Sequence, residues 1–286
     1  MGKQLRRPNP LLRQILKYHP LRGLNSAAPI FWLHMRGLSW ASSPGQIGRT
    51  TRLGLAAGCA VSLLAAALLY LSNVASSFLI GSEDALAPLI VVWLFIFLVN
   101  VLLTLFMDVR AALFGYENYH MRSGDPAVEL ILLTHVERSD LVRAWHAAAQ
   151  VRTWRLFSWI MGVRVTLCIV GFGVALSALD SALLFVLVVS YWACGVILLL
   201  VEPIIRLRAF TALGMAVQAH AGGTMGIFAV GGALLAVWLV ALAALPLGFI
   251  PPVLGLLPFA VHVGWWALVR QFALRRVARH MAAHTA

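Results

Sequence analysis

Two long runs without a charged residue restrict this chain to folds that cross a lipid bilayer. They cover Leu53–Ser82 and Ala85–Met107. About 20 helical residues span the roughly 30 Å hydrocarbon layer of a membrane, and each run exceeds that length. Only Glu83 and Asp84 separate the two runs, so the pattern predicts two successive crossings with a very short connection.

Four further segments meet the same criterion, which gives six predicted crossings. A soluble domain carries about a quarter charged residues, whereas here 11% of the residues are charged and 61% are hydrophobic. One membrane domain therefore uses nearly all of the 286 residues. We predict an all-α, polytopic membrane protein whose later crossings are Phe157–Leu179, Ser181–Val201, Met225–Leu247 and Phe249–Val269.

In this six-crossing topology, nearly all the basic residues lie on one side of the membrane. Of 22 Lys and Arg residues, nine lie in residues 1–52, six in 108–155, two at positions 206 and 208, and four in 270–279. Only Arg164 lies inside a predicted crossing. The three connections expected on the other side of the membrane contain no basic residue. Because cytoplasmic loops are enriched in Lys and Arg, we expect an inner-membrane protein with both termini in the cytoplasm.

The net charge of +12 favours anionic membrane lipid as a partner. The basic residues flank apolar runs and are not interleaved with stacking aromatic residues, which argues against nucleic acid. Cys59, Cys168 and Cys194 occur singly within predicted crossings, so they read as small packing residues. His280 and His284 have ligand spacing but no third ligand, and we expect no metal site.

Residues 1–52 form a predicted cytoplasmic and interfacial segment ahead of the membrane domain at 53–270 and a cytoplasmic tail at 271–286. Asn9-Pro10 is typical of a helix start, and Leu11–Lys17 is amphipathic. We expect this helix and a second piece, Pro29–Arg36, to lie at the inner interface. Ser43-Pro44-Gly45 then breaks the chain before the first crossing.

The connection at 108–155 is the only sizeable soluble segment expected between crossings. Asp125-Pro126 is a start signal for a short helix through Leu133, and Ser139-Asp140 starts another that leads into the third crossing. We therefore expect a helical cytoplasmic loop with a tight corner at Thr134–Arg138.

Within this loop, Glu129-Leu-Ile-Leu-Leu-Thr134 is followed by Ser139-Asp-Leu-Val142. The pair resembles the loop between the second and third spans in permease subunits of exporter-type ATP-binding-cassette (ABC) transporters of the second, ABC-2-like, class. That family has a Glu-Leu-Leu-Leu-Thr-Pro-like run and then a Ser-capped helix, with His135 here in place of Pro. The six-crossing layout with an amphipathic N-terminal helix is similar as well.

The resemblance implies that the chain is a permease that moves an amphipathic or lipidic substrate, with a separate ATPase subunit as its partner. ATP and Mg would bind that partner, because this chain has no phosphate-binding loop. It carries no enzymatic motif either, and we expect it to bind no cofactor. A second permease, identical or related, would complete a dimer. The residues implied to contact the ATPase are Glu129, Leu130, Leu133, Thr134, His135, Val136, Glu137, Arg138, Ser139 and Asp140, with Glu129 braced against Arg143 or Arg122.

Three polar residues at depth are candidates for the substrate path: Arg164, Asn100 and His262. A charge at the centre of a membrane costs on the order of 3 kcal/mol on insertion scales. Arg164 either snorkels to the inner surface or faces an anionic headgroup or an acidic partner such as Asp108 or Glu202. Asn100 and His262 suit a hydrogen bond between helices as well as a substrate contact.

Two other functions remain open at this point. A membrane scaffold or assembly subunit without transport activity would have the same apolar pattern. An ion-coupled transporter or intramembrane enzyme is less favoured, because such proteins need several ionisable groups at depth and Arg164 is nearly alone.

Overall fold

The structure is a computed structural model. It describes residues 44–80, 86–123, 137–177, 182–220 and 256–283, together with positions 31, 35, 38, 41, 43, 231, 232 and 235. The expected N-terminal amphipathic helix, nearly all of the expected crossing at 225–247 and the loop residues 124–136 lie outside these. The described residues are almost entirely helical and contain no strand, which confirms the all-α class for this part of the chain.

Five long helices make up the described fold: α3 (Pro44–Ile80), α4 (Leu86–Ser123), α6 (Arg138–Ser177), α7 (Ala182–His220) and α9 (Leu256–Ala283). The first begins at Pro44, so Ser43-Pro44-Gly45 starts the helix, where we expected a break before the first crossing. Ser43 Oγ accepts a hydrogen bond from the backbone N–H of Gln46 at 3.3 Å, and Pro44 occupies the first helical position.

Three of these helices are long and apolar enough to span a membrane, which indicates membrane integration. The candidate spans are Gly45–Ala75, Ala87–His120 and Arg138–Val174, and they overlap the first three predicted crossings. The fourth and sixth predicted crossings fall on α7 and α9. The count of six stays a prediction.

The helices run further than the crossings require. Between 37 and 40 residues make up each of α3, α4, α6 and α7, whereas about 20 suffice for a bilayer. The expected loop at 108–155 is therefore largely helix, because α4 continues to Ser123 and α6 begins at Arg138. Its second helix continues into the third predicted crossing, whereas its first expected helix and most of the corner lie outside the described residues.

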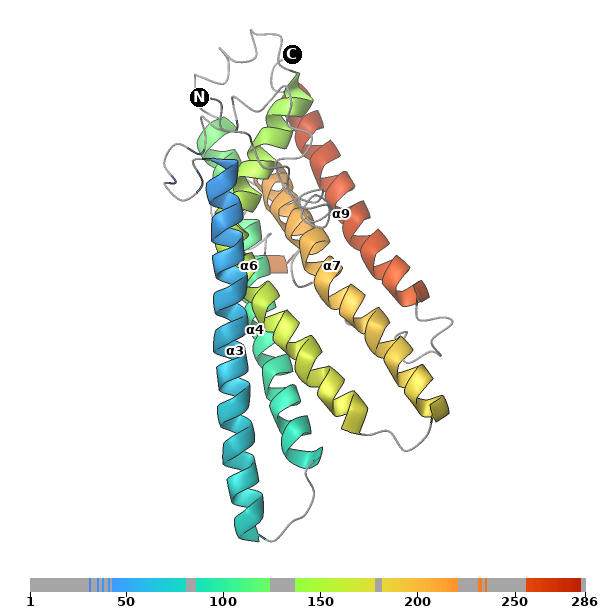
Figure 1. The fold of residues 1–286 in the computed structure, drawn as a ribbon. Coiled ribbons are helices and arrows are strands. Elements are labelled where there is room, and N and C mark those ends of the chain that lie inside the picture. Colours follow the sequence, from blue (N-terminus) through green and yellow to red (C-terminus); the bar gives the residue numbers. More distant parts are fainter. Residues whose placement is uncertain are drawn as a thin grey trace, which may run out of the picture.

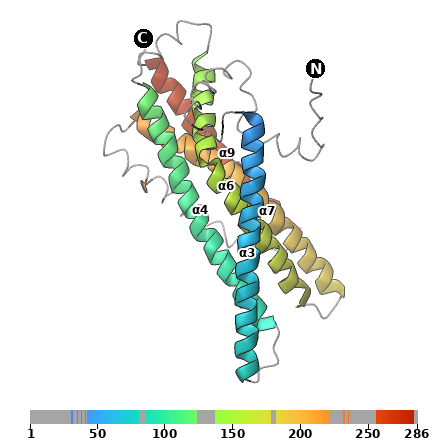
Figure 2. The same cartoon turned by 60° about the vertical axis from the view of Figure 1, so that its left-hand side comes forward.

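From α3 to α7 consecutive helices run in opposite directions, and α9 runs in the same direction as α7 (Figure 1). The start of α3, the end of α4, the start of α6 and the ends of α7 and α9 gather at one end of the bundle, and a second view agrees (Figure 2). We call this the basic end, because it carries Arg49, Arg110, Arg143, Arg208 and Arg276. Toward the opposite end, the pair α6 and α7 diverges from α3 and α4. The charge asymmetry of the sequence thus becomes an asymmetry of the folded chain.

The main hydrophobic core lies toward the basic end. It includes Met107 from α4, Trp145 from α6, Phe210 from α7 and Trp266 from α9, each at most 1% exposed. A smaller cluster of Ala66, Val92, Ile96, Val163 and Leu167 joins α3, α4 and α6 further along.

Two residues of the expected interfacial segment also belong to the main core. Phe31 is 0% exposed and Met35 is 1% exposed. They are four residues apart and lie in helical positions, so both side chains point to one face. This face packs on the protein, where we expected the membrane surface.

Pairs of glycines let two helix pairs approach closely. A Cβ atom on Gly58 of α3 would overlap the carbonyl oxygen of Trp159, and one on Gly162 of α6 would overlap that of Leu55. The same relation joins α4 and α7, where Cβ atoms on Gly115 and Gly214 would overlap the backbone of Thr211 and Ala112. Small residues at such crossings are typical of membrane helices.

Candidate functional site: a buried network of charged residues

Arg164 on α6 lies at the centre of the site, and its side chain is 3% exposed. Its Nε donates a hydrogen bond to Asn100 Oδ1 at 3.1 Å, and its Nη2 donates to Thr104 Oγ1 at 3.0 Å. Nη1 donates to the carbonyl oxygen of Leu199 at 2.8 Å and to Glu202 Oε2 at 3.1 Å. One guanidinium therefore joins α6 to both α4 and α7.

A second arginine extends the network toward the basic end. Arg206 Nη1 donates to Glu202 Oε1 at 2.7 Å, and its Nε donates to Asp108 Oδ2 at 2.9 Å. Its Nη2 also contacts Asp108 Oδ2. The guanidinium carbon lies 5.3 Å from the ring centroid of Trp266, which adds a cation–π contact to α9.

Helical spacing explains why these residues meet. Asn100, Thr104 and Asp108 are four residues apart and share one face of α4. Glu202 and Arg206 stand in the same relation on α7, facing them. Two arginines and two carboxylates balance, so the four charges are buried as a neutral set. Because desolvating a charge costs several kcal/mol, such a set persists only when each charge is paired and hydrogen-bonded.

Pro203 prepares α7 to receive Arg164. Proline has no backbone N–H, so Pro203 cannot donate the helical hydrogen bond to the carbonyl of Leu199, four residues earlier. That carbonyl accepts from Arg164 Nη1 instead. The proline inside α7 thus leaves open an acceptor that the buried guanidinium uses.

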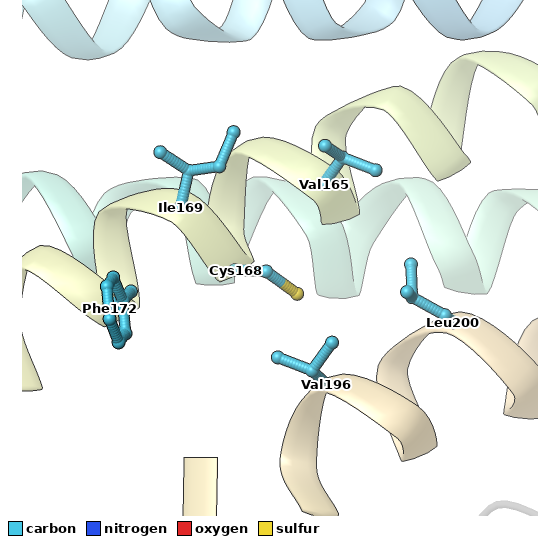
Figure 3. Close-up of a pocket in the computed structure, with 6 residues that line it drawn as sticks. All are labelled: Val165, Cys168, Ile169, Phe172, Val196 and Leu200. Carbon is cyan, nitrogen blue, oxygen red and sulfur yellow. The ribbon is translucent and has the colours of Figure 1, made fainter. Parts of the chain in front are cut away.

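An apolar hollow lies next to this network, between α6 and α7. Its volume is about 300 Å³, and Figure 3 shows its lining residues. Cys168 follows Arg164 by four residues and Val196 precedes Leu199 by three, so the hollow continues along the same helix faces as the charged network. The lining residues are Val165, Cys168, Ile169, Phe172, Val196 and Leu200. Cys168 thus lies in apolar surroundings, as a small apolar packing residue would.

The structure brings together two of the three residues proposed for the substrate path. Arg164 and Asn100 are in direct contact, whereas the side chain of His262 lies outside the described residues. Arg164 does not snorkel to a surface; it is paired with Glu202, and Asp108 is reached through Arg206. The premise that Arg164 is nearly alone was wrong, because three further charged residues surround it.

Sequence reasoning missed Thr104, Arg206 and the role of Pro203. Arg206 and Asp108 were both placed at the ends of predicted crossings, where a charge needs no partner. The four-residue spacing from Asn100 to Asp108 and a proline inside an apolar run were the available signals.

The residues that the resemblance implied for ATPase contact are only partly described. Positions 129–136 lie outside the described residues. Glu137 and Arg138 are exposed at the start of α6. The first backbone hydrogen bond of the helix runs from Leu141 N–H to the carbonyl of Glu137, and Ser139 Oγ donates to Glu137 Oε2 at 3.1 Å. The helix thus begins before Ser139, so Ser139 lies inside the helix and does not act as its cap.

In the described part of the chain, no three His, Cys, Asp or Glu residues lie close enough to hold a metal ion. Comparison of the chain with protein-family models, with curated proteins and with solved structures finds no match. The function is therefore argued from the residues and their geometry.

Proposed function

We propose that this chain is the permease subunit of an ATP-driven exporter of the second ABC class. It resides in the inner membrane with both termini in the cytoplasm, pairs with a second permease and binds one ATPase subunit through residues 129–140. The substrate is amphipathic or lipidic. The proposal starts from the resemblance of residues 129–142 to the coupling loop of that family.

The continuity of α6 is the observation that carries this proposal furthest. One unbroken helix begins at Arg138, inside the proposed ATPase contact, and continues to Ser177. At 1.5 Å per residue its 40 residues are about 60 Å long. Arg164 lies on the same helix and is bonded to α4 and α7. A push on residues 137–140 is therefore passed to three helices without a flexible joint.

The hollow beside Arg164 suits an amphipathic substrate. Its walls are aliphatic and aromatic side chains with one cysteine, which favour an apolar tail. Arg164 and Asn100 lie where such a tail ends and a polar group begins. Movement of α6 would exchange the partners of Arg164 between helix groups and substrate, which is how this site would take part in alternating access.

The test is to purify the tagged protein from its native membrane in mild detergent and to identify what co-elutes. We expect an equal amount of a soluble subunit with a phosphate-binding loop. Glu137→Lys combined with Arg138→Glu reverses both exposed charges at the start of α6 and should release that subunit. Arg275→Glu, an exposed charge of α9 at the same end, is the control and should retain it.

The absence of any ATPase under several gentle conditions would contradict the permease and favour a scaffold or assembly subunit. A second candidate is supported by the buried charges themselves. Two carboxylates and two arginines at one site provide the ionisable groups that an ion-coupled transporter needs. Transport by the purified chain in vesicles under an ion gradient, without an ATPase, would establish that alternative.

A further inference from the structure

Three helices bring ring side chains together at the basic end. Tyr119 lies in the last turns of α4, His220 is the last residue of α7, and His280 lies in the last turn of α9. The Tyr119 hydroxyl is 3.2 Å from His280 Nδ1. The ring centroids of His220 and His280 are 5.7 Å apart. In the sequence only His284 stands at ligand spacing from His280, whereas the fold brings a histidine from another helix beside it.

Each of these two imidazoles has its Nδ1 next to a protein oxygen. His220 Nδ1 donates to the carbonyl oxygen of Ala216 at 3.0 Å, since a carbonyl only accepts. In the neutral ring, Nε2 then carries the lone pair, and within the described part of the chain it makes no hydrogen bond. His280 Nδ1 can donate to the Tyr119 hydroxyl in the same way. Histidines that ligate metals through one ring nitrogen almost always have the other one held by such an oxygen.

The separation of the two rings suits a single ion. Two imidazoles bound to one zinc ion through Nε2 have centroids about 5–6 Å apart, because each Zn–N bond is about 2.0–2.1 Å long. The 5.7 Å between His220 and His280 falls in this range. His146 on α6 differs, since its Nε2 faces the carbonyl of Arg208 and its Nδ1 faces Gln150. Both nitrogens of that ring are used, so it offers no ligand.

We propose that His220 and His280 bind one divalent transition-metal ion through their Nε2 atoms, and that Tyr119 orients His280. Imidazole nitrogen suits zinc, copper or nickel, whereas magnesium and calcium require oxygen ligands. Water would occupy the remaining positions around the ion. The bound ion would join the end of α7 to the last turn of α9, next to the end of α4. The site does not depend on transport activity or on an ATPase.

The test uses the purified full chain in detergent, carrying a tag without histidine and freed of metal with a chelator. Zinc and magnesium are added separately, and zinc affinity is measured by competition with a coloured zinc indicator. We expect zinc to bind and to raise the thermal midpoint, and magnesium to do neither. His220→Ala and His280→Gln each remove one ligand and should weaken zinc binding by at least about tenfold, as loss of a supporting residue already does at metal sites.

Two further variants separate a binding role from a structural one. Tyr119→Phe keeps the ring and removes only the hydroxyl beside His280 Nδ1, so it should weaken zinc binding by about tenfold. His120→Ala is the control: this exposed histidine of α4 lies at the same end, its Nδ1 is 2.8 Å from Gln218 Nε2, and its loss should leave zinc binding unchanged.

His220 is exposed, so His220→Ala should unfold at the native temperature when no metal is present. Unchanged zinc affinity in this variant would overturn the site, whatever the stability of the other variants. An equal loss in His120→Ala would overturn it too, because the histidines of the basic end would then bind zinc without a defined pair. An equal response to magnesium would overturn a site made of imidazole ligands.

Discussion

The two ends of the bundle are built differently. At the basic end, α4, α6, α7 and α9 share a core with buried Trp145 and Trp266. At the opposite end, α3 and α4 expose large apolar side chains, among them Leu71 at 63% and Leu98 at 56%. The helices converge at the first end and diverge toward the second (Figures 1 and 2).

A bilayer around the opposite end would produce this difference. Lipid tails are as apolar as leucine, so helices inside a bilayer gain little from burying leucine against one another. Nearer the membrane surface, water makes burial favourable again, and a larger core forms. The buried charges lie on the side of the larger core, where Arg206 contacts both Phe210 and Trp266. We therefore expect changes at the basic end to cost more than changes at the opposite end.

The largest effect should come from removing the carboxylate that both arginines share. Glu202→Ala leaves Arg164 without its only described ion-pair partner and gives the buried set a net positive charge. Breaking a buried ion pair from one side costs about 3–5 kcal/mol. The measurement is the free energy of unfolding in detergent, followed by tryptophan fluorescence.

The matched control removes the charge together with its partner. Arg164→Met combined with Glu202→Met leaves Arg206 paired with Asp108 and restores neutrality. Replacing a whole ion pair by apolar residues is often nearly neutral, so this double variant should recover most of the loss. If Glu202→Ala alone is as stable as the native chain, the network does not hold the basic end together.

Replacing either of two glycines of α7 by alanine should change the stability less, and the two replacements should act in opposite directions. Gly214, toward the basic end of α7, faces the backbone of Ala112 so closely that a Cβ atom would overlap it. Gly195, toward the other end, has nothing within 4 Å of that position. Gly214→Ala should cost about 1–3 kcal/mol through forced separation of α4 and α7. Gly195→Ala should stabilise by up to about 1 kcal/mol, because alanine favours helix.

Unfolding measurements on both variants give the result directly. Equal changes at the two positions would mean that α7 is packed similarly along its length, and the contrast between the ends would fail.

The helical class and the first three spans could be predicted because they depend on local composition. A charge-free run of 23 residues such as Ala85–Met107 has few possible structures other than a membrane-spanning helix. The pairing of Arg164 with Glu202 was among the alternatives drawn from the sequence, because a charge at depth needs a partner.

The rest depends on contacts between distant segments. Nothing local to Arg206 indicates that Asp108, 98 positions away, lies within hydrogen-bond distance. The burial of Phe31 and Met35 was missed for the same reason, since a stretch that mixes aromatic and basic residues suits a membrane surface and a protein groove equally well. The continuation of α4 to Ser123 was not predicted, because a charge-free run marks the extent of a crossing and not the end of its helix.

The smallest effect concerns the few polar contacts further from the basic end. Ser62 Oγ on α3 lies 2.7 Å from Thr166 Oγ1 on α6, beside the smaller apolar cluster. Hydrogen bonds between membrane helices contribute about 0.6 kcal/mol on average. After Ser62→Ala, Thr166 Oγ1 still has the carbonyl of Gly162 at 3.4 Å, so no buried donor is stranded. We expect a loss of roughly 0.5–1 kcal/mol on that basis, measured with the same unfolding assay. A loss comparable to that of Glu202→Ala would show that the contact between α3 and α6 stabilises this part of the bundle as strongly as the buried charges stabilise the basic end. The difference in packing between the two ends would then not be a difference in stability.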